Sequence, residues 1–130
     1  MALFGLFGGN KNASEKEEKD IPWKLLTSLE QLPQIEEASK TKTVAIFKHS
    51  TRCGISRMVL RQFESGYQID PEQMDLYFLD LLRFREVSDE VGIRFQVIHQ
   101  SPQLIVLKNG ITVAHASHHG IQAHELEQFV

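Results

Sequence analysis

The only cysteine of the chain is the residue with the clearest chemical potential. Cys53 follows an apolar run over residues 43–47 and directly precedes an amphipathic stretch that begins at Gly54. If the stretch is a helix, the sulfur lies at its N-terminus, where unpaired backbone N–H groups and the positive end of the helix dipole favour an anion. Arg52 and Arg57 bring positive charge nearby. The position therefore favours the thiolate, which is the nucleophilic form of cysteine.

Ser56 follows the cysteine by three residues, which places both on the same side of the first helical turn. We expect its hydroxyl to donate a hydrogen bond to the sulfur, but a serine cannot form a disulfide. Each residue also has a plainer interpretation. A lone cysteine most often packs as an inert small hydrophobe, and a serine in a first turn often satisfies local backbone groups. Polar Thr51 and Arg52 before Cys53 argue against simple burial.

Six histidines offer a second kind of chemistry, and three of them, His115, His118 and His119, stand close together. Their spacing matches no closed structural metal site, and no cysteine lies beside them. Ordinary surface histidines after a strand are the preferred interpretation, so we predict no metal site. His49 and His99 are better candidates for residues that line the site around Cys53.

Length and composition limit the class of protein. The 130 residues suit one domain, and 42% hydrophobic with 24% charged residues is the balance of a soluble globular protein. A net charge of -3 gives no broad basic field, so nucleic acid is not an expected partner. A single cysteine favours a reducing compartment, and neither a signal peptide nor a stretch of about 20 apolar residues is present. We therefore expect a cytoplasmic protein with no membrane partner.

The chain divides into a short leader and one folded domain. Residues 8–20 are rich in glycine and charge and lack apolar periodicity, so they cannot bury enough surface to offset the entropy of ordering. We predict a flexible leader over residues 1–20 and a domain over residues 21–130. The apolar residues near the start of the leader are assigned no function.

Periodicity predicts an α/β fold. The expected elements are a helix that starts at Thr27 or Ser28, strands over 43–47 and 74–80, helices over 54–64 and 83–91, strands over 103–107 and 111–115, and a helix over 122–129. A strand, helix, strand crossover makes the first two strands parallel, and Asn109-Gly110 favours a tight antiparallel hairpin. The order βαβ-α-ββα predicts a mixed four-strand sheet with helices on both faces, because each strand is too apolar to leave one face in water.

Four segments resemble the monothiol bacilliredoxin family. They are KHSTRCGIS at 48–56, HQSPQ at 99–103, LKNG at 107–110 and HASH at 115–118, and the likeness runs from about Trp23 to the C-terminus. The resemblance implies a thioredoxin-like fold and thiol–disulfide exchange that removes bacillithiol, a low-molecular-weight thiol, from protein mixed disulfides. Gly54 departs from the family pattern, which often has proline at this position.

Carried onto this sequence, the resemblance makes Cys53 the attacking thiol, puts Ser56 where a resolving cysteine would stand, and makes Pro102 a cis-proline that faces Cys53. The residues then expected to bind substrate are His49, Thr51, Arg52, Gly54, Arg57, Ser101, Pro102 and Gln103. It implies no bound cofactor, with bacillithiol as a co-substrate. The implied partners are S-thiolated proteins, the low-molecular-weight thiol and an upstream reductase.

Two other functions stay open at this point. The tetrapeptide Cys53-Gly54-Ile55-Ser56 also resembles the Cys-Gly-Phe-Ser site of monothiol glutaredoxins, which bind an iron–sulfur cluster between two subunits. Against this, the chain has His118-His119-Gly120 where that family has a glutathione-binding Gly-Gly-x-Asp-Asp element. The third possibility is a thioredoxin-fold binding module whose cysteine is idle.

Overall fold

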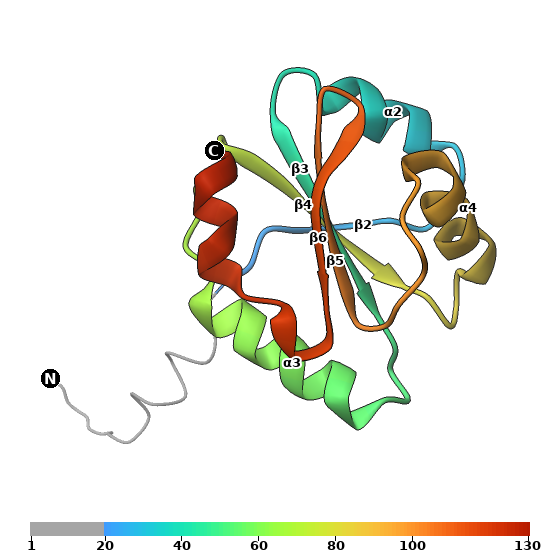
Figure 1. The fold of residues 1–130 in the computed structure, drawn as a ribbon, viewed down its shortest axis with the longest axis vertical. Helices are drawn as coiled ribbons and strands as arrows, with labels where there is room; N and C mark the ends of the chain where they lie inside the picture. The colour runs from blue at the N-terminus through green and yellow to red at the C-terminus, as the bar shows by residue number, and fades with distance from the viewer. Residues whose placement is uncertain (1–19) are drawn as a thin grey trace, which may run out of the picture.

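The computed structural model describes residues 20–130, which form a mixed five-stranded sheet between two layers of helices (Figure 1). The strands are β2 (Trp23–Leu25), β3 (Thr43–His49), β4 (Met74–Asp80), β5 (Gln103–Lys108) and β6 (Ile111–Ser117). Their order across the sheet is β2-β4-β3-β5-β6. The strands β2, β4 and β3 are parallel, whereas β5 and β6 are antiparallel to their neighbours. The central strand β3 leads directly into the Cys53 segment.

Helices cover both faces of the sheet (Figure 1). On one side lie α2 (Gln31–Ala38) and α4 (Arg85–Phe95), and on the other α3 (Gly54–Gly66) and the 3-10 helix η2 (Ala123–Phe129). Alternation along β3 divides the core, because Ala45 and Phe47 pack in the cluster under α3 while Val44 and Ile46 pack in the cluster under α4. The α/β class with helices on both faces of a mixed sheet, predicted from the sequence, is confirmed.

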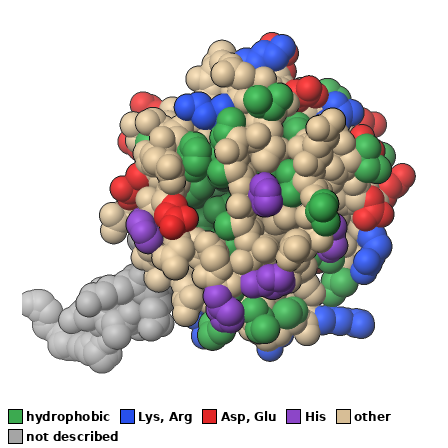
Figure 2. All heavy atoms as spheres, in the orientation of Figure 1, with side chains coloured by type: hydrophobic (Ala, Val, Ile, Leu, Met, Phe, Trp, Pro, Cys, Tyr) green, Lys and Arg blue, Asp and Glu red, His purple; other side chains and the backbone are tan. Residues whose placement is uncertain are grey.

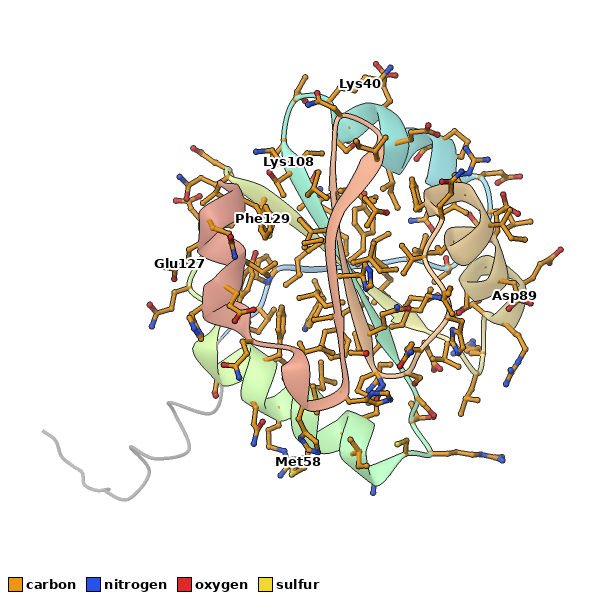
Figure 3. The ribbon with its side chains drawn as sticks, viewed as in Figure 1. Lys40, Met58, Asp89, Lys108, Glu127 and Phe129 are labelled. Atoms are coloured by element: carbon orange, nitrogen blue, oxygen red, sulfur yellow. The ribbon has the colours of Figure 1, made fainter. Side chains whose placement is uncertain are left out.

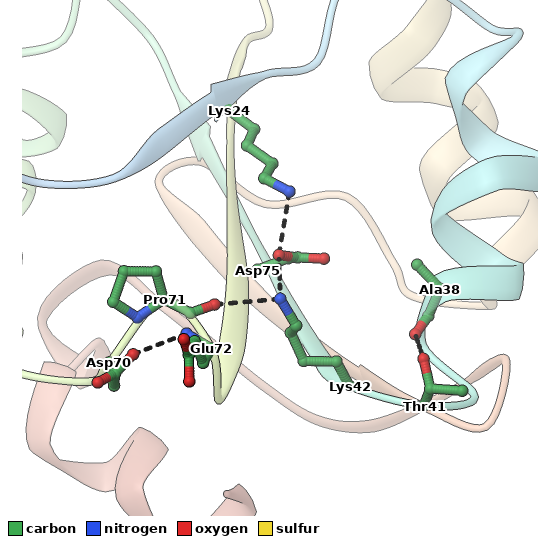
Figure 4. A network of polar contacts seen from close by, with 8 residues as sticks. All are labelled: Lys24, Ala38, Thr41, Lys42, Asp70, Pro71, Glu72 and Asp75. Carbon is green, nitrogen blue, oxygen red and sulfur yellow. Dashed lines mark hydrogen bonds and ion pairs between the residues drawn. The ribbon is translucent and has the colours of Figure 1, made fainter.

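The predicted sheet was one strand too small. The three residues of β2 pair in parallel with β4, which adds an edge strand that its short sequence did not reveal. Lys24 on β2 reaches buried Asp75 on β4 at 3.1 Å, and Lys42 approaches the same carboxylate at 3.1 Å (Figure 4). Trp23 also packs edge-on against Phe78, with ring centroids 5.3 Å apart. Tertiary contacts of this kind, and not local periodicity, hold the strand in place.

The start of one helix and the end of another differ from the predicted boundaries. α2 begins at Gln31 rather than at Thr27 or Ser28, and the Gln31 side chain accepts the N–H groups of both residues at 2.7 and 3.0 Å. α4 continues through Gly92 to Phe95 and ends where Gln96 takes a left-handed conformation with φ of 59°. A Cβ at Gly92 would lie 3.0 Å from the Val97 carbonyl oxygen, so this glycine permits a close turn instead of stopping the helix.

The C-terminal part also departs from expectation. The predicted final helix is a 3-10 helix, η2, and a second short 3-10 turn, η1 (His118–Gly120), precedes it. Along β6 exposed and half-buried residues alternate, so this edge strand leaves one face open, contrary to the premise that every strand is covered on both sides. The hairpin itself is confirmed, with Asn109 and Gly110 at φ of 56° and 79°.

The predicted leader lies outside the described residues, apart from Asp20. Within residues 20–130, no helix has the length and apolar character needed to cross a membrane.

Candidate functional site

Cys53 occupies the N-cap of α3. Its backbone is extended, with φ of -106° and ψ of 121°, and its carbonyl accepts the first helical hydrogen bond from the Arg57 N–H at 3.1 Å. The Cys53 N–H donates to the Ser50 carbonyl at 3.2 Å, which fixes the loop between β3 and α3. The side chain is half-buried and carries a free thiol. The predicted position of the sulfur, at the start of a helix after the central strand, is confirmed.

The residues that flank the cysteine are exposed. The Arg57 guanidinium donates to the Thr51 carbonyl at 3.2 Å and so ties the first turn of α3 to the loop before the cysteine. Thr51, Arg52 and Gly54 are open to solvent. A Cβ at Gly54 would lie 3.9 Å from the Arg57 guanidinium, an ordinary contact, so a side chain could be accommodated there. Gly54 is the first helical residue, a position that suits the proline of the family pattern.

Ser56 lies in a different environment from the predicted one. It is fully buried, its Oγ is 2.9 Å from His49 Nδ1, and the same oxygen accepts the Ser50 N–H at 3.1 Å. Within residues 20–130, no hydrogen bond joins Ser56 to the sulfur of Cys53. The expected O–H to sulfur hydrogen bond is therefore replaced by a contact that joins the end of β3 to the first turn of α3.

The tautomer of His49 decides where the Ser56 hydroxyl proton points. Burial lowers the pKa of His49 from its ordinary value, an effect that Asp80 opposes and Arg57 reinforces. The ring is therefore neutral at pH 7, with one nitrogen that donates and one that accepts. If Nδ1 accepts, the single Ser56 proton points at His49. If Nδ1 carries the proton, it donates to Ser56 Oγ and leaves the hydroxyl proton free for another acceptor.

Ser56→Ala should lower stability more than it lowers activity. The change leaves the Ser50 N–H and His49 Nδ1 without their buried partner, which typically costs about 1–3 kcal/mol. The exchange rate should fall less than about tenfold, because the serine takes no covalent part. Urea unfolding and a thiol-transfer assay measure the two effects, with Ser65→Ala, an exposed serine of the same helix, as the control. A loss of activity above a hundredfold in folded protein would contradict this assignment.

The second segment of the site precedes β5. The Ser101-Pro102 peptide bond is cis, as predicted, and Pro102 is buried. The Pro102 carbonyl accepts the His118 N–H at 3.0 Å, so the turn η1 is bound to this segment. Because β5 is antiparallel to β3, with Gln103 opposite Lys48, the start of β5 and the end of β3 meet at one edge of the sheet. Pro102 and the Cys53 loop therefore share that edge.

Besides Pro102, three polar side chains predicted to bind substrate or to be catalytic are enclosed and do not form the outer surface. His49 is 5% exposed, Gln103 is 1% exposed and Ser56 is fully buried. The Gln103 amide bonds to the backbone of residues 98 and 100, so it supports the loop instead of facing a substrate. Ser101 is half-buried, and its Oγ has no hydrogen-bond partner within residues 20–130.

Sequence analysis missed a buried lysine next to this edge. Lys48 is fully buried, and its Nζ lies 3.1 Å from the Ser88 carbonyl oxygen and 3.3 Å from His99 Nδ1. Burial lowers the pKa of Lys48 to about 8, although Asp89 on α4 (Figure 3) acts in the opposite direction. The sequence did hold a signal, because Lys48 directly continues an apolar run that forms the central strand.

The wild-type protein should become more stable as pH rises from about 8 to about 9.5. Folded Lys48 loses its proton near pH 8, whereas in the unfolded chain it keeps the proton until its ordinary value of 10.5. The unfolded state then binds more protons, so the free energy of unfolding increases with pH. Tyr67, with its pKa raised by burial to about 12, acts oppositely only above about 10. Urea unfolding across this range should show the rise, and Lys48→Met should remove it; an equal rise in the variant would contradict the assignment.

Exposed apolar side chains occur in both segments that form the candidate site. On α3, Ile55 and Met58 are 46% and 42% exposed, and Met58 projects away from the sheet (Figure 3). Ile98, in the segment before Pro102, is 86% exposed. Sequence reasoning placed Ile55 and Met58 on the apolar side of the predicted helix and gave none of the three residues a functional role, because their exposure depends on how the helix and the loop are packed.

The histidines do not gather into a metal centre. Figure 2 shows them spread over one face of the molecule, and no group of three or more His, Cys, Asp or Glu residues within residues 20–130 is arranged to hold a metal ion. His115, His118 and His119 are exposed, and His118 touches the site through its backbone.

The fold and this site define a thioredoxin-fold protein with one thiol. Among solved structures, the chain resembles a candidate oxidoreductase with a thioredoxin fold, at 32% identity and a TM-score of 0.69 over 82% of this chain and 92% of that one. It also resembles thioredoxin from Malassezia sympodialis (22% identity, TM-score 0.63, 85% and 89% of the two chains) and from Fasciola hepatica (16%, 0.60, 82% and 94%).

The model of the monothiol bacilliredoxin family, BrxC, matches residues 24–126. The chain therefore belongs to the monothiol bacilliredoxin family. This membership and the oxidoreductase fold support a thiol redox role.

Proposed function

We propose that this protein is a thiol–disulfide oxidoreductase that removes bacillithiol, or a similar low-molecular-weight thiol, from protein mixed disulfides. The main observation is the half-buried free thiol of Cys53 at the N-cap of a 13-residue helix. Backbone N–H groups at a helix start stabilise negative charge on a nearby sulfur. Exposed Arg52 and Arg57 add positive charge around it.

The reaction is an exchange in which no net oxidation occurs. The Cys53 thiolate attacks the sulfur of the small thiol, a new S–S bond forms, and the bond to the protein sulfur breaks. The substrate protein leaves as a thiolate, which takes a proton from solvent. The small thiol remains on Cys53 as a mixed disulfide, and the other product is the repaired protein.

The second half of the cycle requires an external thiol. Ser56 stands where a resolving cysteine would be needed, and a hydroxyl cannot displace the bound sulfur. A free low-molecular-weight thiol therefore attacks the Cys53 adduct, releases Cys53 as the thiolate and forms a symmetrical small disulfide. An upstream reductase is then needed to return that disulfide to two thiols. Nothing in this cycle calls for a bound cofactor.

The choice of small thiol is tested by offering the protein two forms of one substrate protein, one carrying bacillithiol and the other carrying glutathione on the same cysteine. We expect faster removal of bacillithiol, by at least about tenfold. Intact mass of the substrate protein over time reports each rate. Equal rates for the two substrates would contradict the assignment of bacillithiol as the preferred small thiol. If the protein released neither thiol from its substrate, the proposed activity would be refuted. A brown protein after purification without oxygen would favour the alternative of an iron–sulfur carrier.

A further inference from the structure

The segment directly before Ser101-Pro102 is held by two buried polar side chains. Gln103 Nε2 donates to the Ile98 carbonyl at 3.0 Å, and Gln103 Oε1 accepts the Gln100 N–H at 3.3 Å. Lys48 Nζ lies 3.3 Å from Nδ1 of His99. Each of the three consecutive residues 98–100 is thus contacted once. The segment belongs to neither a helix nor a strand, so it lacks the regular backbone hydrogen bonds of those elements. Hydrogen bonds from side chains hold it instead.

The two holding residues are neighbours in the sheet. Lys48 on β3 stands opposite Gln103 on β5 in the antiparallel register, and their side chains are 0% and 1% exposed. The fourth contact of this group is to the Ser88 carbonyl oxygen of α4, which lies 3.1 Å from Lys48 Nζ. Two central strands, one helix and the loop therefore meet at the Lys48 ammonium group. Burying a lysine and a glutamine carries a desolvation cost unless their polar atoms are paired, as they are here.

The result of this arrangement is an exposed isoleucine on a fixed loop. Ile98 is 86% exposed although its own carbonyl is bonded to a buried side chain. It belongs to the same loop as Pro102, whose strand begins at the sheet edge where the Cys53 loop lies. An apolar side chain on an anchored backbone costs little conformational entropy when a partner covers it. A free small disulfide needs only the Cys53 sulfur in order to react. A protein substrate also requires contact between its polypeptide and the surface next to Cys53.

We propose that Lys48 and Gln103 are positioning residues that hold residues 98–100, so that Ile98 receives the polypeptide part of a protein mixed disulfide. This inference rests on the proposed function and adds a substrate distinction to it. Neither Lys48 nor Gln103 has a hydrogen bond to Cys53 or Ser56 within residues 20–130. The pair therefore acts on recognition of the protein substrate and not on the chemistry at sulfur.

The test compares two substrates with single variants. Lys48→Met and Gln103→Leu should each reduce de-thiolation of a thiolated protein by about fivefold or more, mainly through KM. The rate of Cys53 with the small coloured disulfide dithiodipyridine should change less than about twofold. Ile98→Ser should reproduce this pattern, while Ile93→Ser, at a 71% exposed isoleucine on α4, should alter neither rate. Because Lys48 and Gln103 hold one segment, the double variant should lose less than the product of the two single effects.

Loss on both substrates to the same extent would overturn the proposal, and so would full activity of both variants on the protein substrate. Thermal unfolding identifies a variant that fails to fold. Lys48→Met is expected to fold, because replacing a buried charge with an apolar side chain of similar length is often neutral or stabilising.

A separate readout distinguishes failure of the loop assignment from failure of the proposed function. Hydrogen exchange of the Gln100 amide should be slow in the wild type and at least about tenfold faster in Gln103→Leu. This measurement needs no substrate. Unchanged exchange would overturn the positioning role even if the protein removes small thiols, whereas faster exchange in an enzyme inactive on thiolated protein would refute only the proposed function.

Discussion

Replacing Cys53 with serine should abolish removal of the small thiol from a protein mixed disulfide, with a fall in rate of at least about a thousandfold. The chain has no other sulfur nucleophile, since Cys53 is its only cysteine. A hydroxyl is a far poorer nucleophile than a thiolate near neutral pH. The serine is nearly isosteric and the site is half-buried, so the fold should persist. The measurement is the loss of adduct mass from a thiolated substrate protein.

The matched control is Ile111→Ser. Ile111 is 63% exposed and lies at the hairpin, at the end of the β5–β6 pair remote from Gln103. This variant should retain the full rate, with circular dichroism used to compare the folding of all three proteins. Substantial activity in Cys53→Ser would show that the cysteine does not carry the reaction.

Wild-type protein without any free thiol should stop after one turnover. With Ser56 in place of a second cysteine, the Cys53 adduct has no internal route to resolution. When substrate is in excess, the amount of repaired protein should therefore equal the amount of enzyme. Addition of free bacillithiol should restart the reaction at a rate that increases with its concentration.

The control for this prediction is enzyme whose Cys53 has been alkylated beforehand, which should give no first turnover. Continued repair of substrate, far beyond one equivalent and with no thiol added, would require a resolving group that the chain does not provide. That result would exclude the one-thiol cycle.

The sequence predicted most of the elements because their signals are local. The apolar run before Lys48, the amphipathic stretch after Cys53 and the Asn109-Gly110 turn each fix a strand, a helix or a hairpin through neighbouring residues. The position of the thiol followed from the same signals. The cis bond at Pro102 was expected from the family resemblance, because the spacing of residues alone does not specify it.

The features that were missed depend on contacts between distant residues. β2 exists because Trp23 and Lys24 pair with β4, which lies some fifty residues later in the chain. A three-residue strand is too short for its hydrophobic pattern to reveal this pairing. Ser56 bonds to His49 because helix α3 packs back on the sheet, and that packing takes the hydroxyl away from the predicted bond to sulfur. Gln103 was assigned to substrate binding by its place beside Pro102, but the direction of its side chain on β5 turns it inward.

The central claim is that Cys53 itself receives the small thiol from a protein. The most direct measurement is the intact mass of the purified protein after it has been mixed, without free thiol, with an excess of a substrate protein carrying bacillithiol. We predict one added bacillithiol per chain, located on Cys53 by peptide mapping, and an equal amount of substrate protein that has lost it. Repaired substrate with no adduct on Cys53, or an adduct confined to any other residue, would contradict the account.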